Sequence, residues 1–307
     1  MTFRLKTLLG SAIGLAMMPA AASAQDARFE FRSDNAVERS DPFIDQDVLE
    51  PQGASDLETG FDSNNWFRFV RPVGEGRVWR FEQQARLRRY DDRDDLNSLL
   101  LTPRLQYWAP VGENWQMRVA AEGSVLNRDG DRHYTRLQAE GQLRYRGQPG
   151  GETVLRLRAN QYDFGDQVVA GLDQSQWRVG LEQYGYGQQR RSGWYLAGFF
   201  TDSRADAQRF SFTEAQLRAR TWWQLAEATR GELRLEASQR SYEGPFSIAQ
   251  AFDRDDTRWR ATGRLEHNLG DQMILFGEAG YVDNDSNIDL RSYSGAVFRI
   301  GFRIQNR

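Results

Sequence analysis

The sequence predicts an all-β fold, a transmembrane antiparallel up-and-down β-barrel of about 14 strands within a range of roughly 12 to 16. Three observations predict it. Segments along the whole chain alternate apolar and polar side chains, and aromatic residues stand on the apolar side near the segment ends. After the N-terminal region, no segment approaches the run of about 18 apolar residues that a membrane-spanning helix needs. The alternative is a soluble all-β protein, in which such a segment is a sheet edge or one wall of a sandwich.

The final segment, Arg291–Ile304, shows the alternation most clearly. Successive side chains of a strand point to opposite faces, so residues two apart share a face. The apolar face carries Ala296, Phe298, Ile300, Phe302 and Ile304. The other face is mostly polar and carries Val297, Arg299, Gly301 and Arg303. In a barrel the first face meets lipid and the second meets the lumen, which makes this segment the predicted closing strand.

The N-terminus has the pattern of a secretory signal peptide, which we assign to residues 1–24. Arg4 and Lys6 supply the positive charge, Leu8–Met18 supplies the apolar run, and Ala22-Ser23-Ala24 precedes the expected cleavage site. The mature chain then begins at Gln25, and residues 25–307 form the predicted barrel domain. The chain has no Cys, which excludes disulfide bonds, thiolate metal ligands and an acylated N-terminal Cys.

Strands are predicted wherever the period-two alternation persists between turn-forming residues. They are expected at Ala27–Arg32, Asn64–Arg71, Arg77–Tyr90, Leu99–Ala109, Trp115–Asn127, His133–Arg146, Thr153–Phe164, Gln174–Tyr186, Trp194–Thr201, Arg209–Trp223, Glu232–Arg240, Thr257–Leu269, Gln272–Val282 and Arg291–Ile304. The first is included because single-chain bacterial barrels have an even number of strands. Trp194–Thr201 is apolar on both faces, and Gln272–Val282 is mainly apolar.

Aromatic side chains gather near strand ends on the apolar face: Trp79, Tyr107, Trp115, Tyr145, Trp177, Trp223 and Trp259. Such girdles are typical of outer-membrane barrels, because an amphipathic ring sits at the level of the lipid headgroups. The polar face of a soluble sheet meets bulk water instead. The pattern therefore favours a barrel in the outer membrane of a Gram-negative bacterium, closed because lipid cannot satisfy an open sheet edge.

The connections alternate between tight turns and longer acidic loops. The tight turns are Gly74–Gly76, Pro110–Glu113, Gly147–Gly151 and Gly270–Asp271, and the longer loops are Asp91–Asp95, Asn127–Arg132, Gly165–Asp173, Tyr242–Asp256 and Asp283–Asp289. Outer-membrane barrels place short turns in the periplasm and long loops outside. We therefore expect the final strand to run inward and to leave the C-terminus in the periplasm.

Ser33–Ser63, between the first two predicted strands, has little strand pattern. It is rich in Asp and Glu and is interrupted by Pro42, Pro51 and Gly53. Three roles are open: a long external loop, a disordered linker, or a constriction folded into the lumen. In the last case, charge-assisted contacts with Arg would stabilise the segment.

The polar face of the predicted strands is dominated by Arg, with Glu as the minority partner. We expect the lumen to be lined by Arg80, Arg86, Arg88, Arg104, Arg118, Arg136, Arg144, Arg156, Arg158, Arg178, Arg218, Arg220, Arg234, Arg258, Arg260 and Arg264. Rings of Arg in a pore favour anions or phosphate-bearing solutes. The alternative is that Arg and Glu on adjacent strands pair with each other and only hold a narrow polar interior together.

Other classes of function find little support in the sequence. The formal net charge is −3 and acidic residues are interspersed with basic ones, so no basic patch indicates nucleic-acid binding. Asp283–Asn287 lacks the Gly and terminal Glu of a calcium loop, and neither a metal nor a cofactor is expected. The only His residues are His133, beside Asp129 and Asp131, and His267. With so few candidate bases we expect no enzyme, and an outer-membrane hydrolase is only an alternative.

At Tyr281–Phe302 the chain reads Y-V-D-N-D-S-N-I-D-L-R-S-Y-S-G-A-V-F-R-I-G-F. The D-S-N-I element before a Tyr-containing final strand resembles the end of the barrel domain in surface lipoprotein assembly modifiers. The size of the chain and its predicted strand number are also similar to that domain. The resemblance implies translocation or display of a surface lipoprotein. The chain departs from that family between Gln25 and Ser63, which is too short for the family's usual periplasmic helical-repeat domain.

The predicted function is transport or export across the outer membrane, through or alongside an Arg-lined lumen. The resemblance implies surface lipoprotein translocation, and a passive anion-preferring porin is the alternative. The expected partners are outer-membrane lipid and lipopolysaccharide, the barrel assembly machinery acting through the C-terminal strand, and a lipoprotein or anionic solute.

Overall fold

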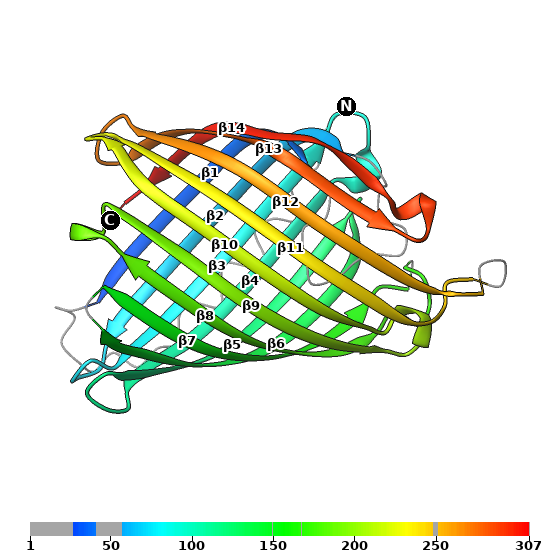
Figure 1. Ribbon diagram of the computed structural model, residues 1–307, viewed down its shortest axis with the longest axis horizontal. Coiled ribbons are helices and arrows are strands. Elements are labelled where there is room, and N and C mark those ends of the chain that lie inside the picture. Colours follow the sequence, from blue (N-terminus) through cyan, green and yellow to red (C-terminus); the bar gives the residue numbers. More distant parts are fainter. Residues whose placement is uncertain (1–26, 41–56, 149, 167, 248–250, 307) are drawn as a thin grey trace.

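The chain folds into one closed β-barrel (Figure 1). The computed structural model describes residues 27–40, 57–148, 150–166, 168–247 and 251–306. Each strand pairs with the next one in sequence, and β14 pairs antiparallel with β1 to close the barrel. The predicted all-β class and the number of fourteen strands are confirmed. The strands are β1 (Arg28–Ser40), β2 (Glu58–Pro72), β3 (Val78–Tyr90), β4 (Ser98–Pro110), β5 (Trp115–Arg128), β6 (Asp131–Gln148), β7 (Gly151–Phe164), β8 (Gln174–Tyr186), β9 (Ser192–Ala205), β10 (Phe212–Ala226), β11 (Thr229–Pro245), β12 (Asp253–Asn268), β13 (Met273–Ser286) and β14 (Tyr293–Gln305).

The alternation sorts side chains between the two faces of the wall. Large apolar residues are exposed on the outer face, as at Leu155, Leu157 and Leu217, whereas most buried polar and charged residues face the interior. Of the predicted aromatic girdle, Trp79 and Trp177 are 42% and 43% exposed on the outside. Every strand has at least 13 residues, which exceeds the roughly 9–11 that a tilted strand needs to cross a bilayer.

Helical structure in the described residues is confined to single turns: η2 (Asp94–Leu96), η3 (Gln188–Arg190), η4 (Gln208–Phe210) and η5 (Asp289–Arg291). Within these ranges, no helix has the length and apolar character required to cross a membrane. The short turns and the C-terminus lie at the left-hand end of Figure 1, and η2, η4 and η5 lie in connections at the other end. We call these the short-turn end and the long-loop end.

The prediction that Ser33–Ser63 lies outside the strands was wrong at both of its ends. β1 continues to Ser40 and β2 begins at Glu58. The alternation was hidden because polar Ser and Asn residues occupy outward positions of both strands. The part from 41 to 56 lies outside the described residues, as does the predicted signal peptide.

The prediction of a long loop at Asn127–Arg132 was also wrong. β5 runs to Arg128 and β6 begins at Asp131, so the connection is the dipeptide Asp129-Gly130. Both residues have positive φ, 49° and 88°. An Asp-Gly pair with this backbone forms the tight hairpin turn whose twist matches the flanking strands.

Closure of the barrel depends on a glycine in the last strand. Gly301 pairs with Ala36 across the β1–β14 seam, and a Cβ at position 301 would lie 2.0 Å from the carbonyl oxygen of Asn35. We expect Gly301→Val to destabilise the barrel by about 1–3 kcal/mol or more, because the strands must separate to admit the side chain. Urea unfolding in lipid vesicles measures this. Gly277→Val on the neighbouring strand is the control, since a Cβ there meets nothing within 4 Å. If both variants lost the same free energy of unfolding, the close approach of the strands at Gly301 would not be what stabilises closure.

Candidate functional site

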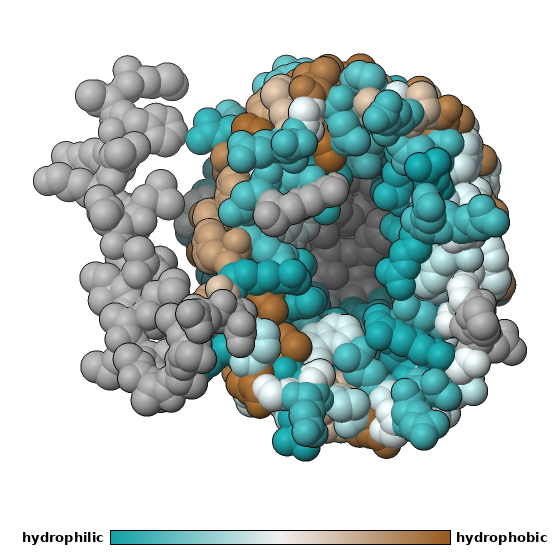
Figure 2. Space-filling model, turned by 90° about the vertical axis from the view of Figure 1, so that its left-hand side faces the viewer, coloured by the Kyte–Doolittle hydropathy of each residue, from teal (hydrophilic) through white to brown (hydrophobic). Residues whose placement is uncertain are grey.

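The interior of the barrel is polar. Figure 2 views the short-turn end and shows hydrophilic side chains around the mouth of the barrel, with hydrophobic residues on the outer wall. The buried polar residues come from β1 to β13; examples are Asp62 on β2, Gln106 on β4, Glu182 on β8 and Arg240 on β11. The candidate functional site is therefore the lumen wall.

Every Arg predicted to line the lumen lies at an inward position of its strand. Arg156 is flanked by Leu155 and Leu157, which are 50% and 59% exposed to the outside, and Arg178 is 4% exposed beside Trp177 at 43%. The other Arg residues of the set lie on β3 to β8 and β10 to β12, and each likewise alternates with residues that face outward. The structure thus brings them into one shared interior, and their role in transport remains a proposal.

The Glu140 cluster is the densest group of charges in the lumen. Glu140 on β6 has a fully buried side chain, and four guanidinium groups surround it. Its carboxylate lies 3.1 Å from Arg104 on β4, 3.2 Å from Arg156 and 3.1 Å from Arg158 on β7, and it also contacts Arg118 on β5. One carboxylate therefore fixes four cations in the wall.

Two neighbouring carboxylates extend the Glu140 cluster along the wall. Glu122 contacts Arg104 and Arg136, and Glu182 contacts Arg156. Among the residues that the structure describes, this enlarged group holds five guanidinium groups and three carboxylates. Arg and Glu therefore pair across strands, as one alternative drawn from the sequence expects, and the preference of the lumen for anions remains a proposal.

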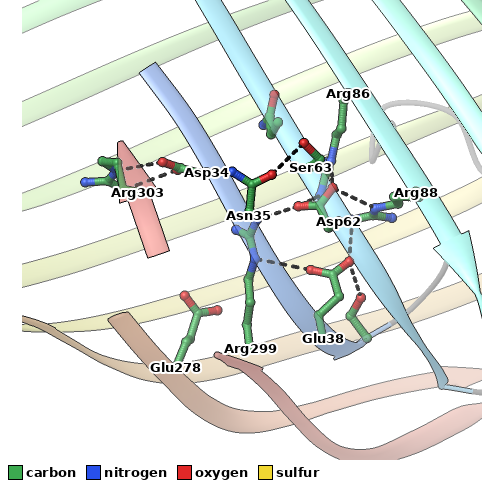
Figure 3. A network of polar contacts seen from close by, with 12 residues as sticks. Asp34, Asn35, Glu38, Asp62, Ser63, Arg86, Arg88, Glu278, Arg299 and Arg303 are labelled. Atoms are coloured by element: carbon green, nitrogen blue, oxygen red, sulfur yellow. Dashed lines mark hydrogen bonds and ion pairs between the residues drawn. The ribbon is translucent and has the colours of Figure 1, made fainter. Parts of the chain in front are cut away.

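A second charge cluster lies where β1, β2, β3 and β14 meet (Figure 3). Asp62 is fully buried and lies 2.6 Å from Arg86 and 3.7 Å from Arg88, and it also contacts Arg299. Glu38 lies 3.3 Å from Arg88 and 3.4 Å from Arg299. This cluster spans the seam of the barrel, so it joins the first strands to the last one.

The wall formed by β11 to β13 repeats the arrangement. Glu278 lies 3.5 Å from Arg234, 3.7 Å from Arg260 and 3.6 Å from Arg264. Sequence analysis did not single out the acidic partners, because the strand register that brings them to particular Arg residues is not visible in one sequence. The predicted lumen lining also left out the inward Arg68 and Arg240, which the alternation includes, and Arg254, which lies in β12 where a loop was predicted.

Inward aromatic rings also contact guanidinium groups, including several that pair with carboxylates. The guanidinium carbons of Arg80, Arg118 and Arg144 lie 5.2–5.5 Å from the centre of the Trp108 ring. Arg218 lies 5.4 Å from the centre of the Phe199 ring, and within the described ranges it has no carboxylate at ion-pair distance. The face of an aromatic ring attracts a cation but carries no net charge. Phe199 also explains why its segment appeared apolar on both faces.

At the long-loop end, the β7–β8 connection packs against the inner wall. Leu172 is 3% exposed and joins a cluster with the inward residues Leu126, Tyr134 and Tyr162. The backbone fixes this packing, since the amides of Asp206 and Ala207 donate to the carbonyls of Asp173 and Gly171 at 2.9 Å. The connection therefore narrows this mouth of the barrel from one side.

We expect Leu172→Asp to widen the mouth and to raise the single-channel conductance. The substitution buries a carboxylate among apolar rings, which costs several kcal/mol unless the connection moves away. Single-channel recording in planar bilayers measures the effect. Leu290→Asp is the matched control, because Leu290 is 74% exposed in η5 at the same end; an unchanged conductance in Leu172→Asp would show that the connection does not limit the current.

Neither His residue belongs to the charge clusters described above. The ring centre of His133 is 6.1 Å from those of Tyr134 and Phe164. His267 is exposed, and its Nδ1 lies 3.0 Å from the hydroxyl of Thr229. In the described part of the chain, no carboxylate pairs with His267 to orient it as a general base, and no group of three potential ligands is arranged to hold a metal.

Comparisons with known proteins identify the fold. No protein-family model and no curated protein matches the chain. The anion-selective porin from Comamonas acidovorans is similar in structure, with TM-score 0.52 and 11% identity over 91% of this chain and 99% of that one. The outer-membrane channel DcaP of Acinetobacter baumannii is also similar, with TM-score 0.51 and 12% identity over 94% of this chain and 100% of that one. In-vitro folded OmpT of Vibrio cholerae has TM-score 0.54 and 8% identity over 91% of this chain and 97% of that one.

These identities show a shared fold and nothing finer. The chain has the closed-barrel fold of outer-membrane porins and channels. The matches do not point to surface lipoprotein assembly modifiers, so the predicted link to that family remains a prediction.

Proposed function

We propose that the protein is a diffusion channel of the Gram-negative outer membrane that prefers anionic solutes. The observation that carries the proposal is the gathering of five guanidinium groups around three carboxylates in the enlarged Glu140 cluster, on the polar inner wall of the barrel. Fixed Arg side chains lining a pore attract anions and repel cations. The fold supports this proposal because porins and channels of the outer membrane share it.

Carboxylates and aromatic rings hold the Arg side chains in place along the wall. Glu140 pairs with Arg104, Arg156 and Arg158, and the Phe199 ring lies against Arg218. A passing carboxylate or phosphate can share these guanidinium groups with Glu140, since each guanidinium has five N–H donors. Because Glu140 competes for the same donors, the solute is bound weakly at each cluster and is released toward the next one. Weak binding at several sites is what conduction requires.

Liposome swelling with three sugars of similar size tests the preference for anions. Liposomes that contain the refolded barrel are diluted into isotonic solutions of gluconate, glucose or glucosamine. The counter-ions of the two charged sugars are chosen so that they do not limit the rate of swelling. We expect gluconate to enter about fivefold faster than glucosamine, which corresponds to a difference of about 1 kcal/mol in the barrier, with glucose between them. Equal rates for all three, or faster entry of glucosamine, would contradict the proposal.

A further inference from the structure

The outer face of β1 and β2 carries a polar patch within the apolar belt. Ser33 pairs with Asn65 and Asn35 with Ser63 in the register of the two strands. We call these four residues the Ser/Asn patch. Corresponding positions in the middle of the other strands hold mainly Ala, Gly, Leu, Val or Phe.

The Ser/Asn patch faces away from the lumen. Outward residues on both sides of it along the strands are exposed: Val37 by 52%, Phe61 by 41% and Phe67 by 42%. The residues next to the patch along each strand point inward. Asp34 pairs with the inward Arg303, and Asp62 pairs with the inward Arg86. Because apolar side chains lie above and below the patch, it lies at the level of the lipid tails.

Hydrogen bonds within the patch satisfy only part of it. The Asn35 amide donates to Ser33 at 2.9 Å, the Ser63 hydroxyl donates to the Asn35 carboxamide oxygen at 2.8 Å, and the Asn65 amide donates to Ser63 at 3.1 Å. Within the described residues, the carboxamide oxygen of Asn65 accepts no hydrogen bond and the Ser33 hydroxyl donates none. Ser33 is 8% exposed, whereas Asn35, Ser63 and Asn65 are half-buried. Hydrocarbon offers no partner for the polar groups that remain exposed, so leaving them against lipid is unfavourable.

We propose that the Ser/Asn patch is the contact surface through which two copies of this chain associate in the membrane. Ser and Asn side chains both donate and accept hydrogen bonds, so the patch is complementary to itself. The two strands also carry the same outward sequence, Phe31-x-Ser33-x-Asn35 and Phe61-x-Ser63-x-Asn65 in the single-letter form F-x-S-x-N. The patch is uncharged, which fits a like surface better than a phosphorylated headgroup. Side-chain hydrogen bonds between Ser and Asn are a recurrent means of association between protein segments in lipid.

Copies related by an axis along the membrane normal keep the same orientation and present this surface to each other. Such an interface is isologous, with the same residues on both sides. The exposed side chains of Val37, Phe61 and Phe67 then form an apolar rim around the hydrogen-bonded centre. The association does not depend on the preference of the lumen for anions.

Single Cys substitutions test the interface directly, because the chain has no Cys of its own. Asn35→Cys and Asn65→Cys are produced in outer membranes and oxidised with copper phenanthroline. Leu157→Cys is the matched control, since Leu157 is 59% exposed on the outer face of β7, halfway around the barrel. We expect covalent dimers for both patch variants and only monomer for the control. Equal cross-linking of all three, monomer for all three, or cross-links to a different protein would overturn the proposal.

A second variant separates association from folding. Asn35→Leu/Asn65→Leu gives β1 and β2 an ordinary lipid-facing surface, and heat-modifiable migration on gels reports whether the barrel is folded. The mass of the detergent complex by light scattering is expected to correspond to two chains for the natural protein and to one chain for the folded variant. A natural protein with the mass of one chain would overturn the proposal, and so would a folded variant that keeps the mass of two.

Discussion

Replacing both Arg104 and Arg156 by Glu is expected to turn an anion-preferring conductance into a cation-preferring one. Arg104 and Arg156 both contact Glu140 in the lumen wall. The enlarged Glu140 cluster has five guanidinium groups and three carboxylates. In Arg104→Glu/Arg156→Glu it has three guanidinium groups and five carboxylates. The sign of the fixed charge in a pore determines which ions it admits. The reversal potential of a planar bilayer under a potassium chloride gradient should therefore change sign.

Two controls distinguish a lumen effect from a change in overall charge. Arg77→Glu/Arg132→Glu reverses the same number of charges at exposed positions, in the β2–β3 turn and beside the β5–β6 turn. It should leave the sign of the reversal potential unchanged. Arg104→Lys/Arg156→Lys keeps the charges and should remain anion-preferring. If the charge-reversed lumen variant folds and still prefers anions, the Glu140 cluster does not set the selectivity.

Asp62→Ala is expected to cost about 3–5 kcal/mol of the free energy of unfolding. The side chain of Asp62 is fully buried among Arg86, Arg88 and Arg299. Removing it leaves three guanidinium groups close together, of which Glu38 contacts Arg88 and Arg299, at the seam where β14 must join β1 and β2. Urea unfolding in lipid vesicles, followed by tryptophan fluorescence, measures the loss.

Asp95→Ala is the control for that measurement. Asp95 lies in η2 outside the barrel wall, its side chain is 60% exposed, and its partner is Arg93. An exposed ion pair contributes about 0–1 kcal/mol, so this variant should unfold almost like the natural protein. A loss in Asp62→Ala no larger than in Asp95→Ala would mean that the cluster does not stabilise the seam.

Alternation alone was enough to predict the barrel and the inward side of the strands. A period of two assigns each residue to lipid or lumen without any knowledge of neighbouring strands, so Arg156 and Arg178 could be placed between exposed apolar residues. It failed where a strand departs from the pattern for a local reason. Ser33 and Asn35 hid the second half of β1, and the Asp129-Gly130 hairpin was mistaken for a long loop.

The grouping of charges could not be predicted, because it depends on register. Glu140 meets Arg104 from β4 and Arg158 from β7 only because four strands align at that height. Asp62 meets Arg299, which is 237 residues away in sequence, only because the barrel closes. Register is set by turn geometry and by the packing of the whole wall, neither of which a single strand pattern contains.

The most direct test of the account is the reversal potential of the refolded natural protein in a planar bilayer under a potassium chloride gradient. The account predicts a steady current whose reversal potential shows preference for chloride, and a fall in that preference as the salt concentration rises, because salt screens the fixed guanidinium charges. A reversal potential near zero or biased toward potassium would contradict an Arg-determined selectivity. The absence of any current from a folded barrel would contradict the channel itself.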